Sequence, residues 1–376
     1  MTGVQTCALP IFDQDRKKTL ESRLPGLHKV VYHNLLGNQG ERAMRVRAIA
    51  RDIGRNLLNE DAYYGDSLSG QAAIAAKLSK ADLLTDMVGE FPELQGIMGG
   101  YYARHDGLSV EISEAIEDHY KPRFSGDSLP RNMVGVVTAL ADKLETLVGL
   151  FGINQLPTGD KDPFGLRRHT LGILRLLDEK QLKIDLFTLL KIANAQFKAL
   201  GNFKQNDDVI LDFIYERAVS QYMEHGYTRN ETEAALIIDH KNIYTVRKRL
   251  EAVKAFAALP EAPALAAANK RVSNILKKSE TTVEAIVNAD KLQEPAEIAL
   301  NTALSKVKPQ ADKLFEAGDY TASLQALAAL KTPVDDFFDN VLVNADDVHL
   351  KNNRLALLSQ LHQTMNRVAD LSKLAS

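Results

Sequence analysis

Residues 139–177, ALADKLETLVGLFGINQLPTGDKDPFGLRRHTLGILRLL, show the alternation of helix and loop that decides the fold. Apolar residues recur at helical spacing on both sides of an irregular segment, residues 152–168. Asp162 followed by Pro163 is typical of an N-cap and a first helical turn, so we expect a new helix to begin there. The same periodicity continues through nearly the whole chain, whereas strand-like alternation is almost absent. The sequence therefore predicts an all-α protein.

Length and composition limit the class of protein. A chain of 376 residues is expected to form two or three domains, and 45% hydrophobic with 25% charged residues is ordinary globular composition. The single cysteine, Cys7, excludes a disulfide framework and fits a reducing, cytoplasmic compartment. No stretch reaches the roughly 20 apolar residues that span a bilayer, so we expect no contact with a membrane.

Basic residues gather in one region. Residues 241–278 hold nine Lys or Arg against Glu251 and Glu261, a local net charge of +7. Because the whole chain carries −3, the remainder must carry −10 (−3 minus +7). A concentration of positive charge in an otherwise acidic chain indicates a surface for nucleic acid.

Residues 91–130, FPELQGIMGGYYARHDGLSVEISEAIEDHYKPRFSGDSLP, with residues 137–149, VTALADKLETLVG, resemble the late helices of the HD phosphohydrolase fold. His119 and Asp142 match two metal-binding positions of that fold. Asp82 stands in the signature position but follows an alanine, and residues 41–50, ERAMRVRAIA, lack the family's first histidine. Two ligands are too few for a divalent metal, so we predict a degenerate centre with no metal and no phosphohydrolase activity.

The histidines of this region can also be explained by structural roles without a metal. His119 shares a helix face with Ile112 and Ile116, which favours a core histidine. The dipeptide His105-Asp106 is followed by Gly107, so it is expected at a surface helix end rather than in a metal site.

A longer resemblance covers nearly the whole chain from Phe12. Residues 80–107, KADLLTDMVGEFPELQGIMGGYYARHDG, and the opening stretch 139–177 resemble the bacterial glycyl-tRNA synthetase β subunit family. The resemblance implies an α2β2 ligase in which the α subunit makes glycyl-adenylate and the β subunit engages glycine tRNA. It also implies that this chain is a carboxy-terminal fragment without catalytic residues, and that ATP and Mg are used by the whole ligase and not bound by this chain.

The carboxy-terminal part carries a second resemblance. Residues 247–278, RKRLEAVKAFAALPEAPALAAANKRVSNILKK, and residues 334–374 resemble the DALR-type helical-bundle domain, which binds anticodons. On a helical wheel the apolar residues of 265–276 occupy one arc and the basic residues the opposite one. The residues of this basic arc, two on the preceding helix and the amide of Asn269, which can pair with base edges or equally fix a loop, are predicted to bind tRNA: Arg247, Lys254, Asn269, Lys270, Arg271, Asn274, Lys277 and Lys278.

Further candidates follow from the same comparison. Lys161, Arg167 and Arg168 are placed to meet phosphates of the acceptor arm, although ordinary surface charge explains them equally well. The aromatic residues Phe256, Tyr222 and Tyr244 are candidates for stacking on bases, with a core position as the more common alternative. Asn353 and Arg354 are expected to hold the last helices together.

We expect the chain to be organised in four parts: a non-native tail (1–11), an HD-like helical domain (12–165), a helical connector (166–205) and a DALR-type domain with the carboxy-terminal helices (206–376). The predicted function is the tRNA-binding part of a glycine–tRNA ligase β subunit. Two alternatives remain open: an active HD-type metal phosphohydrolase, and a helical docking module that touches only protein.

Overall fold

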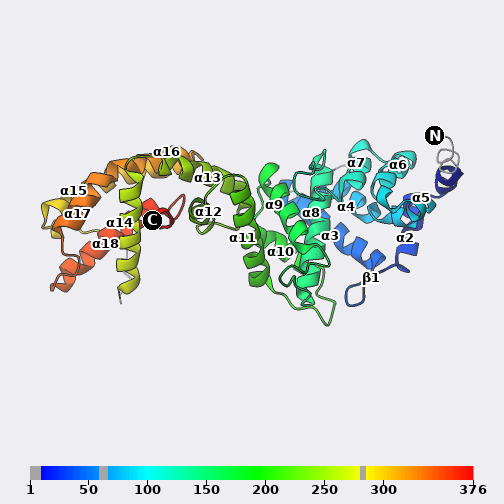
Figure 1. Cartoon of the computed structure of the whole chain (residues 1–376), viewed down its shortest axis with the longest axis horizontal. Helices are drawn as coiled ribbons and strands as arrows, with labels where there is room; N and C mark the ends of the chain where they lie inside the picture. The colour runs from blue at the N-terminus through cyan, green and yellow to red at the C-terminus, as the bar shows by residue number, and fades with distance from the viewer. Residues whose placement is uncertain (1–9, 59–66, 280–284, 376) are drawn as a thin grey trace. The chain divides into compact units, whose positions relative to one another are not determined.

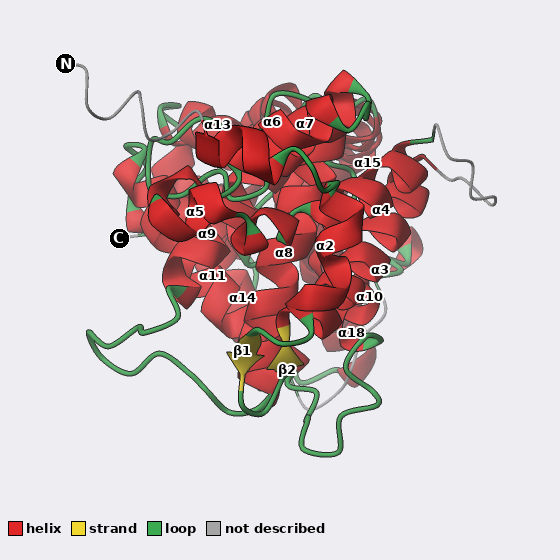
Figure 2. Ribbon diagram, turned by 90° about the vertical axis from the view of Figure 1, so that its right-hand side faces the viewer, coloured by secondary structure: helices red, strands yellow, loops and turns green. Residues whose placement is uncertain are grey.

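The computed structural model describes residues 10–58, 67–279 and 285–375. Helices make up most of the described structure and almost all of its regular elements, which confirms the predicted all-α class (Figures 1 and 2). A short antiparallel hairpin, β1 (Val31–His33) and β2 (Gly37–Asn38), is the exception. The predicted tail, residues 1–11, lies outside the described residues except for its last two. No helix in the described ranges is long and apolar enough to cross a membrane.

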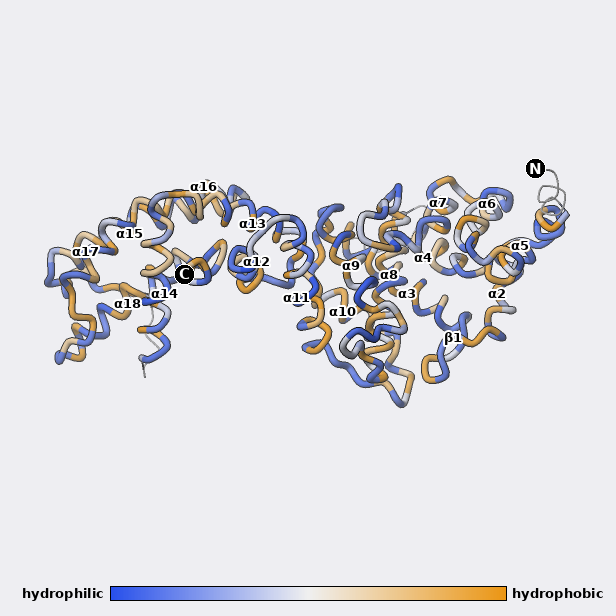
Figure 3. Tube along the Cα trace, viewed as in Figure 1, coloured by the Kyte–Doolittle hydropathy of each residue, from blue (hydrophilic) through white to orange (hydrophobic). Residues whose placement is uncertain are grey.

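Internal contacts divide the chain into two compact units, Met1–Ala218 and Val219–Ser376. The division falls within helix α11 (Asp207–Glu224), beyond the polar segment at which the sequence places the start of the last domain. Hydrophilic and hydrophobic residues alternate along the helices of each unit (Figure 3), as expected for helices that bury one face.

Unit 1 is built around α8 (Met133–Gly152), whose side chains are buried from Val134 to Gly152. Its length and almost uninterrupted apolar sequence make it the central helix, on which the others pack. The helices in contact with α8 are α3 (Gln39–Leu58), α4 (Leu68–Leu78), α7 (Val110–Asp118), α9 (Leu166–Glu179) and α10 (Leu186–Asn194). The predicted connector, residues 166–205, thus contributes two helices to this core.

Shorter elements complete unit 1. They are α2 (Leu20–Leu27), η1 (Ala81–Leu84), α5 (Asp86–Glu90), η2 (Pro92–Leu94) and α6 (Ile97–His105). Helix α6 ends with His105 and has Asp106 as its C-cap, which confirms the predicted helix end. The Asp106 carboxylate accepts a hydrogen bond from the backbone N–H of Leu20 at 2.7 Å, so it fixes the start of α2 rather than a metal.

The helix expected to begin at Asp162-Pro163 begins later. Gly165, in the left-handed conformation with φ 64°, is the N-cap of α9, and Leu166 is its first residue. The Asp162 carboxylate still accepts hydrogen bonds from the backbone N–H groups of Leu166 and Arg167, at 2.8 and 2.9 Å. The aspartate therefore satisfies the free N–H groups of the helix from a position further upstream than the usual cap.

Unit 2 is also helical. Its elements are α12 (Arg229–Leu236), α13 (Ile243–Ala257), α14 (Ala262–Lys278), η3 (Ala289–Lys291), α15 (Pro295–Glu316), α16 (Tyr320–Ala326), η4 (Leu327–Leu330), α17 (Lys331–Asn340), α18 (Val348–Met365) and η5 (Leu371–Leu374). Pro260 and Pro263 separate α13 from α14, as predicted, with Pro263 in the first turn of α14.

The last helices are joined by the two residues for which a structural role was predicted. The Arg354 guanidinium contacts the Glu297 carboxylate and donates to the backbone carbonyl of Leu342 at 2.6 Å. The Asn353 amide pairs with the backbone of Asn288, accepting at 2.8 Å and donating at 3.0 Å. Both side chains are buried, so they connect α18 with α15 and with the segment before η3.

Candidate nucleic-acid interface and degenerate metal centre

The fold brings His119 and Asp142 together around a lysine. His119 is the C-cap of α7, Asp142 lies on α8, and Lys80 comes just before η1. The Lys80 ammonium lies 2.8 Å from His119 Nε2 and 3.2 Å from the Asp142 carboxylate. All three side chains are buried. A cation supplied by the chain therefore occupies the space between the two groups that match metal ligands.

Asp82, the third matching position, faces a different partner. One of its carboxylate oxygens accepts hydrogen bonds from the backbone N–H groups of Gly96 and Gly99, at 2.5 and 3.1 Å. Asp82 thus binds the start of α6, where the dipole of the helix favours a negative charge. Among the described residues, no three His, Cys, Asp or Glu side chains form a group able to hold a metal ion.

Arginines complete this centre from α3, in the segment that lacks the first histidine of the HD fold. Arg42 lies 3.0 Å from both the Asp142 and the Glu145 carboxylates, and Arg45 donates to Glu145 at 2.9 Å. Burial alone would raise the pKa of Asp142, but Arg42 and Lys80 hold it well below its usual range. Burial lowers the pKa of Lys80 to about 8.

His119 is held as a neutral core residue, the alternative favoured by its apolar face. Burial, with the Lys80 charge beside it, lowers the pKa of His119 well below its usual value. Its Nδ1 lies 2.6 Å from the carbonyl of Ile116, which fixes the proton on Nδ1 and leaves Nε2 to accept from Lys80. Both ring nitrogens are therefore engaged within the protein.

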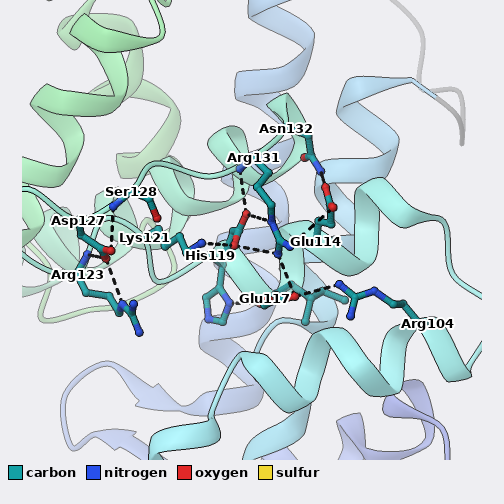
Figure 4. A network of polar contacts seen from close by, with 12 residues as sticks. Arg104, Glu114, Glu117, His119, Lys121, Arg123, Asp127, Ser128, Arg131 and Asn132 are labelled. Carbon is teal, nitrogen blue, oxygen red and sulfur yellow. Dashed lines mark hydrogen bonds and ion pairs between the residues drawn. The ribbon is translucent and has the colours of Figure 1, made fainter.

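Asp118, the residue before His119, belongs to a separate network of ion pairs (Figure 4). Its carboxylate contacts Arg131 at 2.8 Å and Lys121 at 2.9 Å. Arg131 also pairs with Glu117 at 2.9 Å, while the His119 ring points away from this cluster in Figure 4. Asp118 thus orders the loop after α7 and takes no part in the centre around Lys80.

The residues predicted to form the basic side of α14 do so. Lys270, Arg271, Asn274, Lys277 and Lys278 are all exposed, and we refer to them as the α14 basic face. None of its four cations has a carboxylate within ion-pair distance among the residues that the structure describes. Lys270, Arg271, Asn274 and Lys278 also line a shallow groove of about 420 Å³ together with Ala267 and Ile275. Positive charge here is available to an external partner.

Asn269 does not join this face, contrary to the prediction. It is fully buried, and its amide exchanges hydrogen bonds with that of Asn366 at 2.8 and 3.0 Å. The buried Asn269 amide is thus satisfied by Asn366, and the pair connects α14 to the end of α18. The core alternative likewise holds for Phe256 and Tyr222, which are 0% and 2% exposed, whereas Tyr244 is partly exposed.

The remaining candidates are spread over both units. On α13, Lys254 is exposed, with its ammonium 5.3 Å from the centre of the Tyr227 ring, and Arg247 is half-buried. In unit 1, Lys161 and Arg168 are exposed, whereas the Arg167 guanidinium binds the carbonyl of Gly159. Arg167 therefore closes its own loop, while Lys161 and Arg168 point positive charge outward.

Comparison with known proteins assigns the class and then the family. Residues 265–373, which include most of α14 and all later helices, match the DALR anticodon binding domain, so unit 2 carries a domain of this class. Residues 8–237 match the model described as glycyl-tRNA synthetase beta subunit. The chain belongs to the glycyl-tRNA synthetase beta subunit family.

Individual relatives agree with the family. The chain is 60% identical to the glycine–tRNA ligase beta subunit of Dechloromonas aromatica over 365 residues, which are 97% of this chain and 50% of the relative. It is 61% identical to the proteins of the same name from Janthinobacterium sp. and Thiobacillus denitrificans, again over 97% of this chain and 51% of each relative. The chain thus spans about half the length of the curated relatives it matches.

Proposed function

We propose that this chain is the tRNA-binding portion of a glycine–tRNA ligase β subunit, and that the α14 basic face contacts the anticodon arm of glycine tRNA. The main evidence is a row of four exposed cations within a domain that matches the DALR anticodon binding domain. None of the four has a carboxylate within ion-pair distance among the described residues. Single exposed cations without a carboxylate within ion-pair distance also occur elsewhere on the described surface, such as Lys183, Lys191 and Lys306, but on α14 four of them lie together on one helix face.

The chemistry of this face suits RNA. Lysine and arginine neutralise backbone phosphates, which provides affinity without reading sequence. Asn274 is exposed between the cations, so its amide can donate to and accept from base edges in a single-stranded loop. Arg271 lies 4.2 Å over the Phe338 ring, which holds its guanidinium plane at the surface.

The resemblance to whole β subunits supports the rest of the proposal. The chemistry of glycine activation, with its ATP and Mg, belongs to an α subunit in an α2β2 assembly in the cytoplasm. Lys161 and Arg168 of unit 1 contact the acceptor arm. No amino-acid activation is assigned to this chain.

We also propose that unit 1 has no phosphohydrolase activity. A divalent metal would have to displace the Lys80 ammonium from between His119 and Asp142 and break the Arg42 contact with Asp142. Release of phosphate from nucleotides by the purified chain with Mn²⁺ or Mg²⁺ would contradict this proposal. Loss of that release in Asp142→Asn, but not in the surface variant Asp160→Asn, would show that the activity belongs to the centre.

The test of tRNA binding compares glycine tRNA with the same tRNA carrying altered anticodon bases, at two salt concentrations. We expect tighter binding of the native anticodon, with a preference of roughly tenfold or more, since a lost base contact costs about 1–3 kcal/mol. Equal, strongly salt-dependent binding of both RNAs would overturn the anticodon assignment and leave only phosphate contacts. The absence of any RNA binding would favour docking to an acidic protein instead.

A further inference from the structure

A pocket of about 620 Å³ opens beside the degenerate centre of unit 1. Its volume lies within the roughly 300–1,000 Å³ usual for small-molecule sites. Six cationic side chains line it against three carboxylates, Glu93, Glu117 and Asp142, for a net charge of +3 with His169 neutral. The six cations are Arg42, Lys80, Lys121, Arg123, Lys143 and Arg168.

Four of these cations have carboxylate partners within the protein. Arg42 and Lys80 share Asp142 at the base of the pocket. At the rim, Lys121 contacts Asp118 at 2.9 Å and Arg123 contacts Asp127 at 3.1 Å, so both are held in fixed positions (Figure 4). The positive charge that is left uncompensated therefore comes from the remaining two residues, Lys143 and Arg168.

Lys143 is a buried cation without a carboxylate partner among the described residues. Its side chain is on α8, the residue is 3% exposed, and its ammonium donates to the backbone carbonyl of Tyr120 at 3.1 Å. Burial lowers the pKa of Lys143 to about 8, because the more distant carboxylates of Asp142 and Asp127 offset only part of the cost of burying the charge. An anion beside this ammonium would offset that cost.

Helix α9 shapes the site around Lys143. A Cβ at Gly172 would lie 2.6 Å from Lys143 Cε, so the glycine leaves the space through which the lysine passes. One turn before it, Arg168 and His169 line the pocket. Arg168 is exposed and has no carboxylate within ion-pair distance in the described part of the chain.

We propose that this pocket, here called the Lys143 pocket, binds the phosphate of a phosphomonoester of about mononucleotide size. Lys143 and Arg168 supply the two charges, and the exposed Phe164 ring on the pocket wall offers a surface for a base. A phosphomonoester carries a charge of about −1.5 to −2 at neutral pH and has three acceptor oxygens, which matches two converging cations better than a carboxylate does.

The proposal does not rest on the proposed tRNA function, because every lining residue is in unit 1 and the first probe is a free nucleotide. Calorimetric titration of the full chain with AMP, with inorganic phosphate as competitor, is the test, and adenosine is the matched ligand without phosphate. We expect saturable binding of AMP, competition by phosphate, and binding of adenosine at least about tenfold weaker, since charged hydrogen bonds contribute roughly 1.5–3 kcal/mol.

Variants locate the binding site. Arg168→Gln is expected to weaken AMP binding by about tenfold, and Lys143→Gln to abolish it. Lys183→Gln removes an exposed charge of the same unit that lies outside the pocket lining and has no role in the proposed tRNA contact, so binding should remain unchanged. If Lys143→Gln fails to fold, the Arg168→Gln variant still tests the proposal, because Arg168 is exposed and its replacement is not expected to affect folding.

An RNA end is the other source of the same chemical group. A short RNA hairpin with a 5′-phosphate is compared with the same hairpin carrying a 5′-hydroxyl. Arg168-dependent binding of AMP supports a free nucleotide, and Arg168-dependent binding of only the phosphorylated hairpin supports an RNA end. The proposal is overturned if neither probe binds in an Arg168-dependent way, or if Lys183→Gln weakens binding as much as Arg168→Gln does.

Discussion

The centre around Lys80 and the α14 basic face use the same residue types for opposite purposes. In unit 1, Lys80 and Arg42 point inward, are buried and share Asp142. In unit 2, the cations of the α14 basic face point outward and have no acidic partner in the described ranges. Burial and partners thus distinguish cations that hold the fold together from cations that are available to a ligand.

The largest effect is expected at the buried centre. Asp142→Ala leaves Arg42 and Lys80 buried without their shared carboxylate, which should lower the free energy of unfolding by about 3–5 kcal/mol. Denaturant unfolding followed by circular dichroism measures this change. Asp160→Ala, which removes an exposed carboxylate from a loop of the same unit, should stay within about 0.5 kcal/mol. Adding Lys80→Met to Asp142→Ala should restore part of the loss, and a further loss would contradict the assignment of Lys80 as the uncompensated charge.

Two asparagines of α14, one buried and one exposed, allow the same comparison between buried and exposed residues within a single helix. Asn269→Ala removes the two hydrogen bonds that join α14 to the end of α18 and should lower the free energy of unfolding by about 1–3 kcal/mol. Asn274→Ala, on the exposed face of the same helix, should leave stability unchanged and weaken the binding of glycine tRNA. The reverse pattern would show that the buried and exposed roles are wrongly assigned.

The lowered pKa of Lys143 predicts that the free energy of unfolding depends on pH. Burial lowers its pKa from 10.5 to about 8, so between these values the unfolded chain binds more protons than the folded chain. Stability attributable to Lys143 must therefore rise with pH across this window, by at most about 1.4 kcal/mol per pH unit for one group. The measurement compares the unfolding free energies of the wild type and Lys143→Met from pH 8 to 10. A wild-type advantage that is constant or falls over this range would refute the shift.

The smallest effect on stability is expected at the exposed face. Lys278→Ala should change the free energy of unfolding by less than about 0.5 kcal/mol. Its effect should instead appear in RNA binding, where losing one phosphate contact reduces the salt slope by about 0.7–0.9. Fluorescence anisotropy with labelled tRNA measures this slope, and Lys306→Ala on α15 is the exposed control.

Helical periodicity in the sequence predicted the fold class and the break between α13 and α14, because amphipathic spacing and proline act locally. The start of α9 was misplaced, since the positive φ of Gly165 and the reach of the Asp162 carboxylate depend on the conformation of the loop. The hairpin β1–β2 was not predicted because two strands of three and two residues leave no period to detect.

Only part of the candidate sites could be predicted from the sequence. The exposed residues of the α14 basic face followed from the helical wheel alone. Asn269 lies beside Leu276 at the edge of the apolar arc, so the wheel already separates it from the basic face. Its partner, Asn366, is 97 residues away in the sequence and could not be predicted. The sequence did not predict Lys80, Arg42 and Lys143, because the HD resemblance points to metal ligands and not to cations. Lys143 and Glu145 are nevertheless charged residues within the mainly apolar sequence of α8, which is a signal of a buried polar site.

The most direct test of this account compares two double variants for binding to glycine tRNA over a range of salt concentrations. One removes two cations of the basic face, Lys270→Ala with Arg271→Ala, and the other removes two exposed lysines of α15, Lys306→Ala with Lys313→Ala. The account predicts that the first pair weakens binding by about tenfold or more and lowers the salt slope by about 1.4–1.8, for two phosphate contacts. The second pair should leave both quantities unchanged. Equal effects of the two pairs, or none from the first, would contradict the assignment of the α14 basic face as the RNA contact.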